Sequence, residues 1–208
     1  ERLNEIREIS HFETLDQATW VEVIDDVAYV AVGQSGLQII NVSDPTNPSE
    51  IGNIDLLEAA CIDVDGDVAY VADWTDGLRS IDISNPAEPQ LIDVFDPDDG
   101  IYKVQIIGNL AYLAAYRGGL RIVDISDPSN LNPIGHFDTN GEARGIMVIE
   151  NIAYIADGAN GLVLIDVSNL EELSHLGTFD TPGLAHGVFV LGENAYVADF
   201  EAGLRIIN

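Results

Sequence analysis

The side chains best suited to binding chemistry fall at equivalent positions of a repeated pattern. One position holds Tyr102, Arg144 and His186, and Lys103 directly follows Tyr102. Arginine and lysine pair with carboxylates, and aromatic rings stack on cations. Because the chain has only 8 Lys and Arg, this grouping predicts an arc that recognises an anionic ligand. The predicted ligand-binding residues are Trp20, Trp74, Tyr102, Lys103, Tyr116, Arg117, Arg144, His186, Asp199 and Phe200.

Two other interpretations of charged positions stay open. The basic residues could simply neutralise nearby acids such as Asp98, Asp157 and Glu201, which is the usual role of exposed charges. Glu22 and Asp63 occupy one equivalent position in neighbouring repeats. If both point into a shared channel they could hold calcium, although two carboxylates are few oxygen ligands for this ion. No other metal and no cofactor is predicted.

No catalytic residue is predicted. Of the four histidines, only His186 falls among the candidate binding residues. The single cysteine, Cys61, belongs to a distant repeat, so a cysteine–histidine nucleophile pair is not expected. The chain also lacks the spacing of a zinc site and a glycine-rich phosphate loop. The lack of a convergent acid and base favours binding over catalysis.

Five copies of one unit must position these residues. Ala-Tyr begins at residues 28, 69, 111, 153 and 195, and Gly-Leu follows seven residues after each tyrosine. A period of about 42 residues suits either four short strands or a pair of helices. Alternating apolar and polar residues, separated by turn residues such as Asp65-Gly66, indicate strands. An Asn or Asp ends each third strand and is predicted to organise the turn that follows.

Stacking of these units predicts an all-β fold. Four-stranded units cannot bury both faces alone, so we expect a five-bladed β-propeller of antiparallel blades, as one domain over residues 1–208. The last unit stops at Asn208 after its third strand, whereas residues 6–14 (IREISHFET) align with the outer strand at 173–181 (LSHLGTFDT). Residues 1–14 are therefore predicted to form the outer strand of blade five and close the ring.

The units resemble the LVIVD-repeat family. The resemblance rests on strands such as Leu120–Asp124 (LRIVD) and Leu162–Asp166 (LVLID), with AYVAD and DP elements, and covers almost the whole chain. It implies a bacterial or archaeal surface or secreted protein. It brings no catalytic motif, so it implies a fold rather than a reaction.

The net charge limits the partners. With 36 Asp and Glu, the formal net charge is -28, which disfavours nucleic acid and anionic membrane surfaces and favours a monomer by mutual repulsion. No apolar run approaches the ~18 residues of a membrane span. Such acidity is compatible with an extracellular or cell-surface location, which we expect. The start at Glu1 without a methionine is consistent with a removed leader or neighbouring domain.

Three functions follow from these observations. The first is a non-catalytic binding or adhesion module of a secreted or cell-surface protein, with a protein, peptide or glycan on the ring face. The second is a hydrolase or lyase that acts on an anionic or sugar substrate through Tyr102, Arg144 and His186. The third is a structural scaffold without a ligand.

Overall fold

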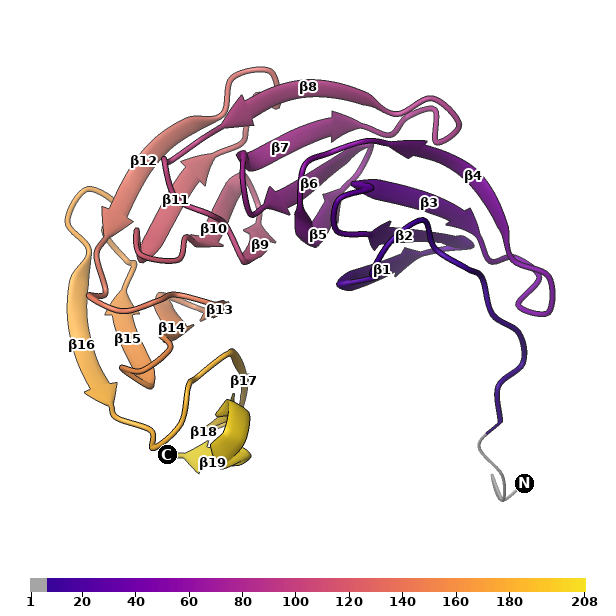
Figure 1. The fold of residues 1–208 in the computed structure, drawn as a ribbon. Helices are drawn as coiled ribbons and strands as arrows, with labels where there is room; N and C mark the ends of the chain where they lie inside the picture. Colours follow the sequence, from indigo (N-terminus) through magenta and orange to yellow (C-terminus); the bar gives the residue numbers. More distant parts are fainter. Residues whose placement is uncertain (1–6) are drawn as a thin grey trace.

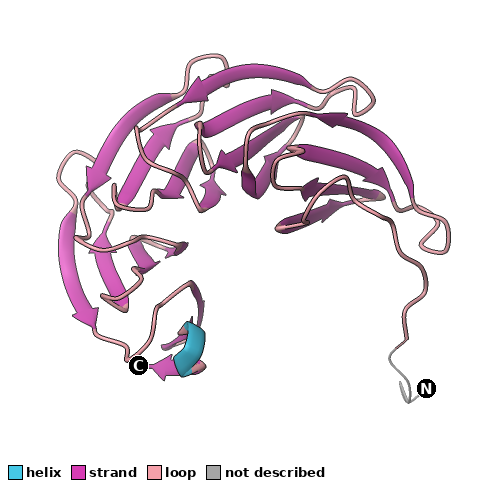
Figure 2. Cartoon of the chain, in the orientation of Figure 1, coloured by secondary structure: helices cyan, strands magenta, loops and turns pink. Residues whose placement is uncertain are grey.

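The chain forms an open arc of five antiparallel β-sheets, as Figures 1 and 2 show for a computed structural model that describes residues 7–208. Four sheets have four strands and the fifth has three. In each sheet the strands follow chain order from the inside of the arc outward. Each sheet is therefore one propeller blade, and the all-β, propeller-like prediction is confirmed.

The strands have the following bounds. Blade one holds β1 (Trp20–Ile24), β2 (Val27–Ala31), β3 (Leu37–Asn41) and β4 (Ser49–Ile54). Blade two holds β5 (Ala59–Asp65), β6 (Val68–Asp73), β7 (Gly77–Asp82) and β8 (Gln90–Phe95). Blade three holds β9 (Lys103–Ile107), β10 (Leu110–Ala114), β11 (Leu120–Asp124) and β12 (Asn132–Phe137). Blade four holds β13 (Gly145–Ile149), β14 (Ile152–Ala156), β15 (Leu162–Asp166) and β16 (Ser174–Phe179). Blade five holds β17 (Gly187–Leu191), β18 (Asn194–Ala198), the 3-10 turn η1 (Phe200–Ala202) and β19 (Leu204–Ile207).

The repeated Asn and Asp residues organise the turns after the third strands. Asn41 Oδ1 accepts a hydrogen bond from Ser43 N at 2.9 Å, and Asp82, Asp124 and Asp166 accept the equivalent bond. These Asx turns redirect the chain toward the fourth strand without an external ligand. The structural interpretation of these residues is confirmed. No helix among the described residues is long and apolar enough to cross a membrane.

The hydrophobic core lies between the blades rather than within one blade. Side chains alternate along each strand, so every blade has a forward face toward the next blade and a backward face toward the preceding one. Between blades one and two, Leu37 and Ile39 from the first forward face pack with Ile62, Val71 and Ile81 from blade two. Equivalent clusters fill the three later boundaries. Each blade therefore depends on its neighbours for burial.

The innermost strands are also joined by side chains that cross the boundaries. Asp63 Oδ2 accepts a hydrogen bond from Ile106 N at 2.7 Å, and Gln105 Oε1 accepts one from Val148 N at 2.7 Å. Met147 Sδ faces Val190 N at 3.1 Å in the same way. The equivalent position of the next blade is Phe189, which is exposed. We call these contacts the inter-blade bonds.

The predicted ring closure is wrong for this structure. β19 pairs only with β18 among the described residues, and blade five is a three-stranded sheet. The two ends of the described chain lie on opposite sides of an open gap in Figure 1. The alignment of residues 1–14 with an outer strand says nothing about how strongly the row of blades curves. That curvature depends on how the facing sides of adjacent blades pack. Residues 1–6 of that segment lie outside the described residues.

Residues 7–16 lie on the backward face of blade one. Phe12 packs against Val30 and Ile40, and Ser10 Oγ donates a hydrogen bond to Pro45 O at 2.7 Å. The segment thus contacts blade one as the fourth strand of a preceding blade would, but it pairs with no strand among the described residues.

The inter-blade bonds predict a specific loss of stability. Replacing Asp63 with alanine leaves the partly buried Ile106 N–H without its acceptor and should lower the free energy of unfolding by about 1–3 kcal/mol. Asp63→Asn keeps an acceptor oxygen, as Gln105 does naturally in the next blade, and should unfold close to the parent chain. Urea unfolding measures both. Equal stability of Asp63→Ala and the parent chain would show that this bond contributes nothing.

Candidate functional site

A cavity of about 730 Å³ opens on the inner side of the arc and is built from all five blades. The first residues of the innermost strands and the residues just before them supply most of its wall, and Trp74 comes from the loop between the second and third strands of blade two. A volume of this size suits a small ligand or the end of a larger one. The lining residues are Thr19, Trp20, Glu58, Ala59, Ala60, Trp74, Tyr102, Lys103, Arg144, Gly145, Ile146, His186, Gly187 and Val188.

Aromatic rings cluster at blades two and three. The ring centroids of Trp74 and Tyr102 are 4.4 Å apart, and Tyr116 meets the Trp74 ring edge-on at 4.9 Å. Trp74 follows β6, and Tyr102 precedes β9, so two neighbouring blades bring the rings together. Mutual packing fixes the rings and leaves an apolar, polarisable surface on the cavity wall.

Arg144 is held at the wall by an acidic partner. Its Nη2 donates a hydrogen bond to Glu142 Oε2 at 2.6 Å, while Tyr116 Oη donates to Glu142 Oε1 at 2.7 Å. The bond from Arg144 is the leading cause that lowers the pKa of Glu142 below its ordinary value. Arg144 Nε is buried and has no hydrogen-bond partner within the part of the chain that the structure describes. The guanidinium is thus held at the wall by Glu142.

Lys103 reaches across the inside of the arc. Its Nζ lies 2.9 Å from the centre of the Trp20 ring, which belongs to blade one. Burial lowers the pKa of Lys103, whereas the nearby Cys61, Asp63 and Glu22 favour its charged form. A cation against an indole face is favourable, and more so where water is partly excluded.

His186 forms the blade-five side of the wall. Its ring centre lies 6.2 Å from that of Tyr102. His186 is an exposed residue, yet partial burial and the Arg144 guanidinium lower the pKa of its ring below the ordinary value. Both effects favour the neutral form of the His186 ring. Burial also raises the pKa of Tyr102, so its phenol keeps its proton.

The structure brings together Trp20, Trp74, Tyr102, Lys103, Arg144 and His186 from the predicted set. Tyr116 lies behind them against Trp74. Arg117 is exposed and stacks on Tyr116, outside the lining. Asp199 and Phe200 line a separate shallow cavity on blade five, which shares only His186 with the first.

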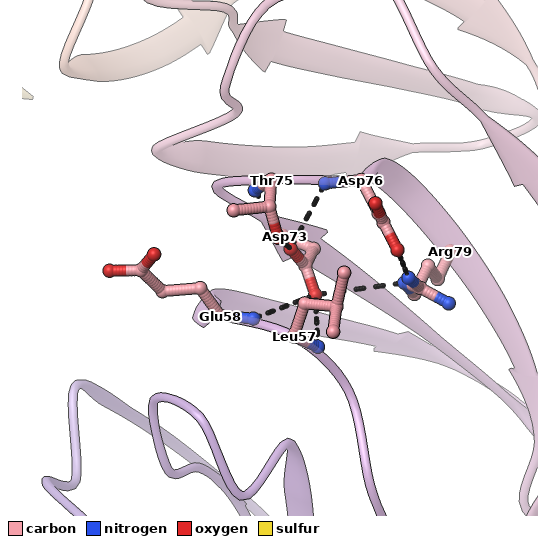
Figure 3. Close-up of polar contacts among 6 residues, drawn as sticks. All are labelled: Leu57, Glu58, Asp73, Thr75, Asp76 and Arg79. Atoms are coloured by element: carbon pink, nitrogen blue, oxygen red, sulfur yellow. Dashed lines mark hydrogen bonds and ion pairs between the residues drawn. The ribbon is translucent and has the colours of Figure 1, made fainter.

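Asp199 belongs to a set of buried aspartates that organise the loops after the second strands. Figure 3 shows Asp73, the equivalent residue of blade two, accepting hydrogen bonds from Leu57 N, Glu58 N and Thr75. Asp199 accepts bonds from Thr181 Oγ1 at 2.6 Å and Gly183 N at 3.1 Å. These carboxylates are fully buried and tie loops that shape the cavity. Asp199 is thus placed as a structural residue.

The equivalent aspartates of blades two and four differ in proton affinity. Burial opposes the charge of Asp73, but its several N–H and O–H donors prevail, so its pKa is lowered. The Asp157 carboxylate accepts hydrogen bonds from Thr139 and Asn160, and Asp138 and Glu142 lie near it. Burial therefore dominates and raises the pKa of Asp157 to about 6.

The predicted calcium residues are engaged in packing between blades. Asp63 makes the inter-blade bond to Ile106, whereas Glu22 Oε2 is buried without a hydrogen-bond partner among the described residues. Burial raises the pKa of both carboxyls. Across residues 7–208, no three or more His, Cys, Asp or Glu side chains converge as a metal site.

Sequence reasoning missed Glu58 and Glu142. Both stand two residues before the variable position of their repeat, occupied by Ala60 and Arg144. Glu58 lines the cavity, and Glu142 orients Arg144. An acid at one repeat position in two blades was the signal that could have identified them.

Comparisons with known proteins support the fold. The model of the LVIVD repeat matches five times, at residues 17–56, 58–96, 102–139, 140–181 and 182–208. The crystal structure of the computationally designed Ika8 protein matches 94% of this chain at 9% identity with a TM-score of 0.77. The chain spans only 59% of the length of that protein. The designed Ika4 protein matches 72% of this chain, and 89% of its own, at 9% identity and a TM-score of 0.60. No curated protein matches.

The pKa of Asp157 predicts a pH-dependent stability. Folding raises this pKa from 3.8 to about 6, so the folded chain binds the proton more tightly than the unfolded chain. The stability from Asp157 is therefore present below pH 3.8 and is lost as pH rises through about 6. Relative to Asp157→Asn, the parent chain should lose up to about 3 kcal/mol over this window.

Asp73→Asn is the matched control for this titration. The lowered pKa of Asp73 gives stability that is present above the unfolded pKa and lost as pH falls. Denaturant unfolding across pH gives the difference in unfolding free energy between the parent chain and each variant. This difference should change with pH in opposite directions for Asp73→Asn and Asp157→Asn. A change in the same direction would contradict the pKa shifts assigned to Asp73 and Asp157.

Proposed function

Since the chain belongs to the LVIVD-repeat family, we propose that it is a non-catalytic binding module for an anionic group carried by a glycan, peptide or protein. The repeat model matches the blades and names no ligand, so the proposal rests on the cavity. The family and the fold make it a repeat β scaffold. The proposal adds that the scaffold holds a ligand. An extracellular or cell-surface location forms part of it.

The charge of the cavity carries the proposal. Lys103 and Arg144 line it, and Glu58 is the only acid among the lining residues. The chain as a whole has 36 acids against 8 Lys and Arg. A wall with two basic residues and one acid, inside a strongly acidic protein, favours an anion there. The Arg144 guanidinium on the cavity wall suits a carboxylate or phosphate oxygen.

The aromatic cluster adds a second kind of contact. Trp74 and Tyr102 stand beside Arg144 and His186 on the cavity wall. Such rings bury the apolar face of a sugar or side chain, while the basic groups orient its acidic group. The proposed ligand therefore combines an anionic group with a ring or an aliphatic stem.

The second candidate function is catalysis on the same ligand. Tyr102, Arg144 and His186 meet at one wall, as a hydrolase or lyase of an anionic sugar would require. The protonated Tyr102 and neutral His186 could serve as acid and base. However, no carboxylate hydrogen bonds to His186 within residues 7–208, and such a partner is what orients a catalytic histidine in many enzymes.

Binding can be measured without a label. Both tryptophans of the chain, Trp20 and Trp74, line the cavity, so ligands found on arrays of acidic glycans and acidic peptides should change the intrinsic fluorescence. Arg144→Gln should weaken binding about 10- to 100-fold, because it removes a charge-assisted hydrogen bond. The melting temperature should stay close to that of the parent chain.

Arg117→Gln is the matched control, because it removes the same charge from an exposed side chain outside the lining. It should leave affinity within about twofold. Equal losses in the two variants would indicate unspecific attraction and defeat the proposal. Conversion of a bound ligand by the parent chain, abolished in His186→Ala, would replace binding with catalysis.

A further inference from the structure

Lys103 is the only lysine of the chain, and it stands where two cavities on the inner side of the arc meet. It begins β9 and lines the cavity of about 730 Å³ described above. It also lines a smaller cavity of about 390 Å³, which shares Trp20, Ile146 and Val188 with the first. The side chain is half-buried rather than enclosed, so its amine is accessible to a molecule bound in the larger cavity.

Lys103 lacks an acidic partner. Among the described residues no carboxylate forms an ion pair with it, although the chain has 36 Asp and Glu. Its Nζ lies instead 2.9 Å from the centre of the Trp20 ring. Burial lowers the pKa of Lys103, because its effect exceeds the opposing effect of Cys61 and two nearby acids. Lys103 therefore holds more free amine at neutral pH than a solvated lysine does.

The free amine of a lysine is a nucleophile. It adds to aldehyde and keto carbons, and it is activated where it is desolvated or stands near another cation. Lys103 is partly desolvated against the Trp20 ring, and Arg144 lines the same cavity. The thiol of Cys61 does not compete, because the residue is 1% exposed and burial raises its pKa. Lys103 is thus the accessible nucleophile of this wall.

We propose that Lys103 captures the aldehyde or keto group of a ligand that also carries a carboxylate, and holds it as an imine. This capture rests on the binding function proposed above and narrows the ligand to a carbonyl acid, either an oxo acid or a sugar acid in its open-chain form. Arg144 pairs with the carboxylate, while Lys103 bonds to the carbonyl carbon. Trp74 and Tyr102, on the same wall, cover the apolar part of the ligand.

The capture needs neither an oxidant nor a reductant. After the ammonium loses its proton to water, the amine nitrogen forms a bond to the carbonyl carbon and the C–O bond breaks. The oxygen leaves as water with the two remaining amine protons. Addition of water reverses the reaction and releases the ligand unchanged. Capture therefore lengthens the residence of a ligand without converting it, as a binding module requires.

Reductive trapping tests the capture on the full chain. The protein is incubated at neutral pH with glyoxylate, an oxo acid, or with glucuronate, a sugar acid, and cyanoborohydride reduces any imine to a stable secondary amine. Peptide mapping by mass spectrometry locates the adduct. Because the chain has a single lysine, only Lys103 and the α-amino group can react. We expect Lys103 to react at least as fast as the α-amino group, and the faster of the two probes identifies the kind of acid.

The α-amino group serves as an internal reference. An ordinary lysine, with a pKa of about 10.4, holds far less free amine at neutral pH than an α-amino group, whose pKa is about 7.7–8.0, so it should react roughly 10-fold or more slowly. This lag should appear at Lys103 when urea unfolds the chain. Trapping confined to the α-amino group of the folded chain would overturn the capture, as would the same ratio of the two adducts with and without urea.

Neutral probes separate the amine chemistry from the binding of the carboxylate. Glycolaldehyde and glucose keep the carbonyl of glyoxylate and glucuronate but lack the carboxylate. Arg144→Gln removes a charge-assisted hydrogen bond and should slow the trapping of the acids at Lys103 about 10-fold more than that of the neutral probes. Arg117→Gln removes the same charge outside the cavity and should change the trapping of the acids less than about twofold.

Lys103→Arg keeps the positive charge, removes the nucleophile and should leave only the α-amino adduct. If Lys103 is not trapped while acidic ligands still change the tryptophan fluorescence, the capture is wrong and the binding function stands. If Lys103 traps neutral and acidic probes equally, and Arg144→Gln changes neither, the carbonyl-acid ligand and the anion-binding function are both overturned.

Discussion

Burial between neighbouring blades is the constraint on which the whole structure depends. Each blade is apolar on both faces, so no blade can hide its own side chains. Leu37 and Ile39 are fully buried only because blade two covers them. The free energy of the fold therefore accumulates at boundaries, as in other repeat proteins whose units contact only their neighbours. In this structure the outward faces of blades one and five stay exposed, because no neighbouring blade covers them.

The inter-blade contacts also determine where the cavity lies. Asp63, Gln105 and Met147 join successive innermost strands, and this leaves the residues just before these strands free to vary. Tyr102, Arg144 and His186 stand at such positions and form the wall together. Scaffold and site are thus separate sets of positions within one repeat. This separation explains why a repeat model can match every blade without identifying a ligand.

Sequence predicted the units, their strands and six of the fourteen residues that line the cavity, because these depend on local alternation and on the period. It could not predict the curvature, since a small change of angle at each boundary decides between a ring and an open arc. It could not show the direction of the Glu22 and Asp63 side chains, which depends on the neighbouring blade. It could not show that Asp199 is buried and accepts hydrogen bonds from Thr181 and Gly183, because burial and hydrogen bonding cannot be read from a position in the repeat.

Curvature connects the two ends of the arc to the cavity. Trp20 in blade one and His186 in blade five line the same cavity, although three blades separate them along the chain. Their separation is set by the sum of four boundary angles, so a small change at each boundary accumulates across the cavity. Lys103 spans part of this width by placing its ammonium on the Trp20 ring. Any contact that bends the arc at its ends therefore alters the width of the cavity, and a ligand that touches both blade one and blade five would in turn favour one curvature.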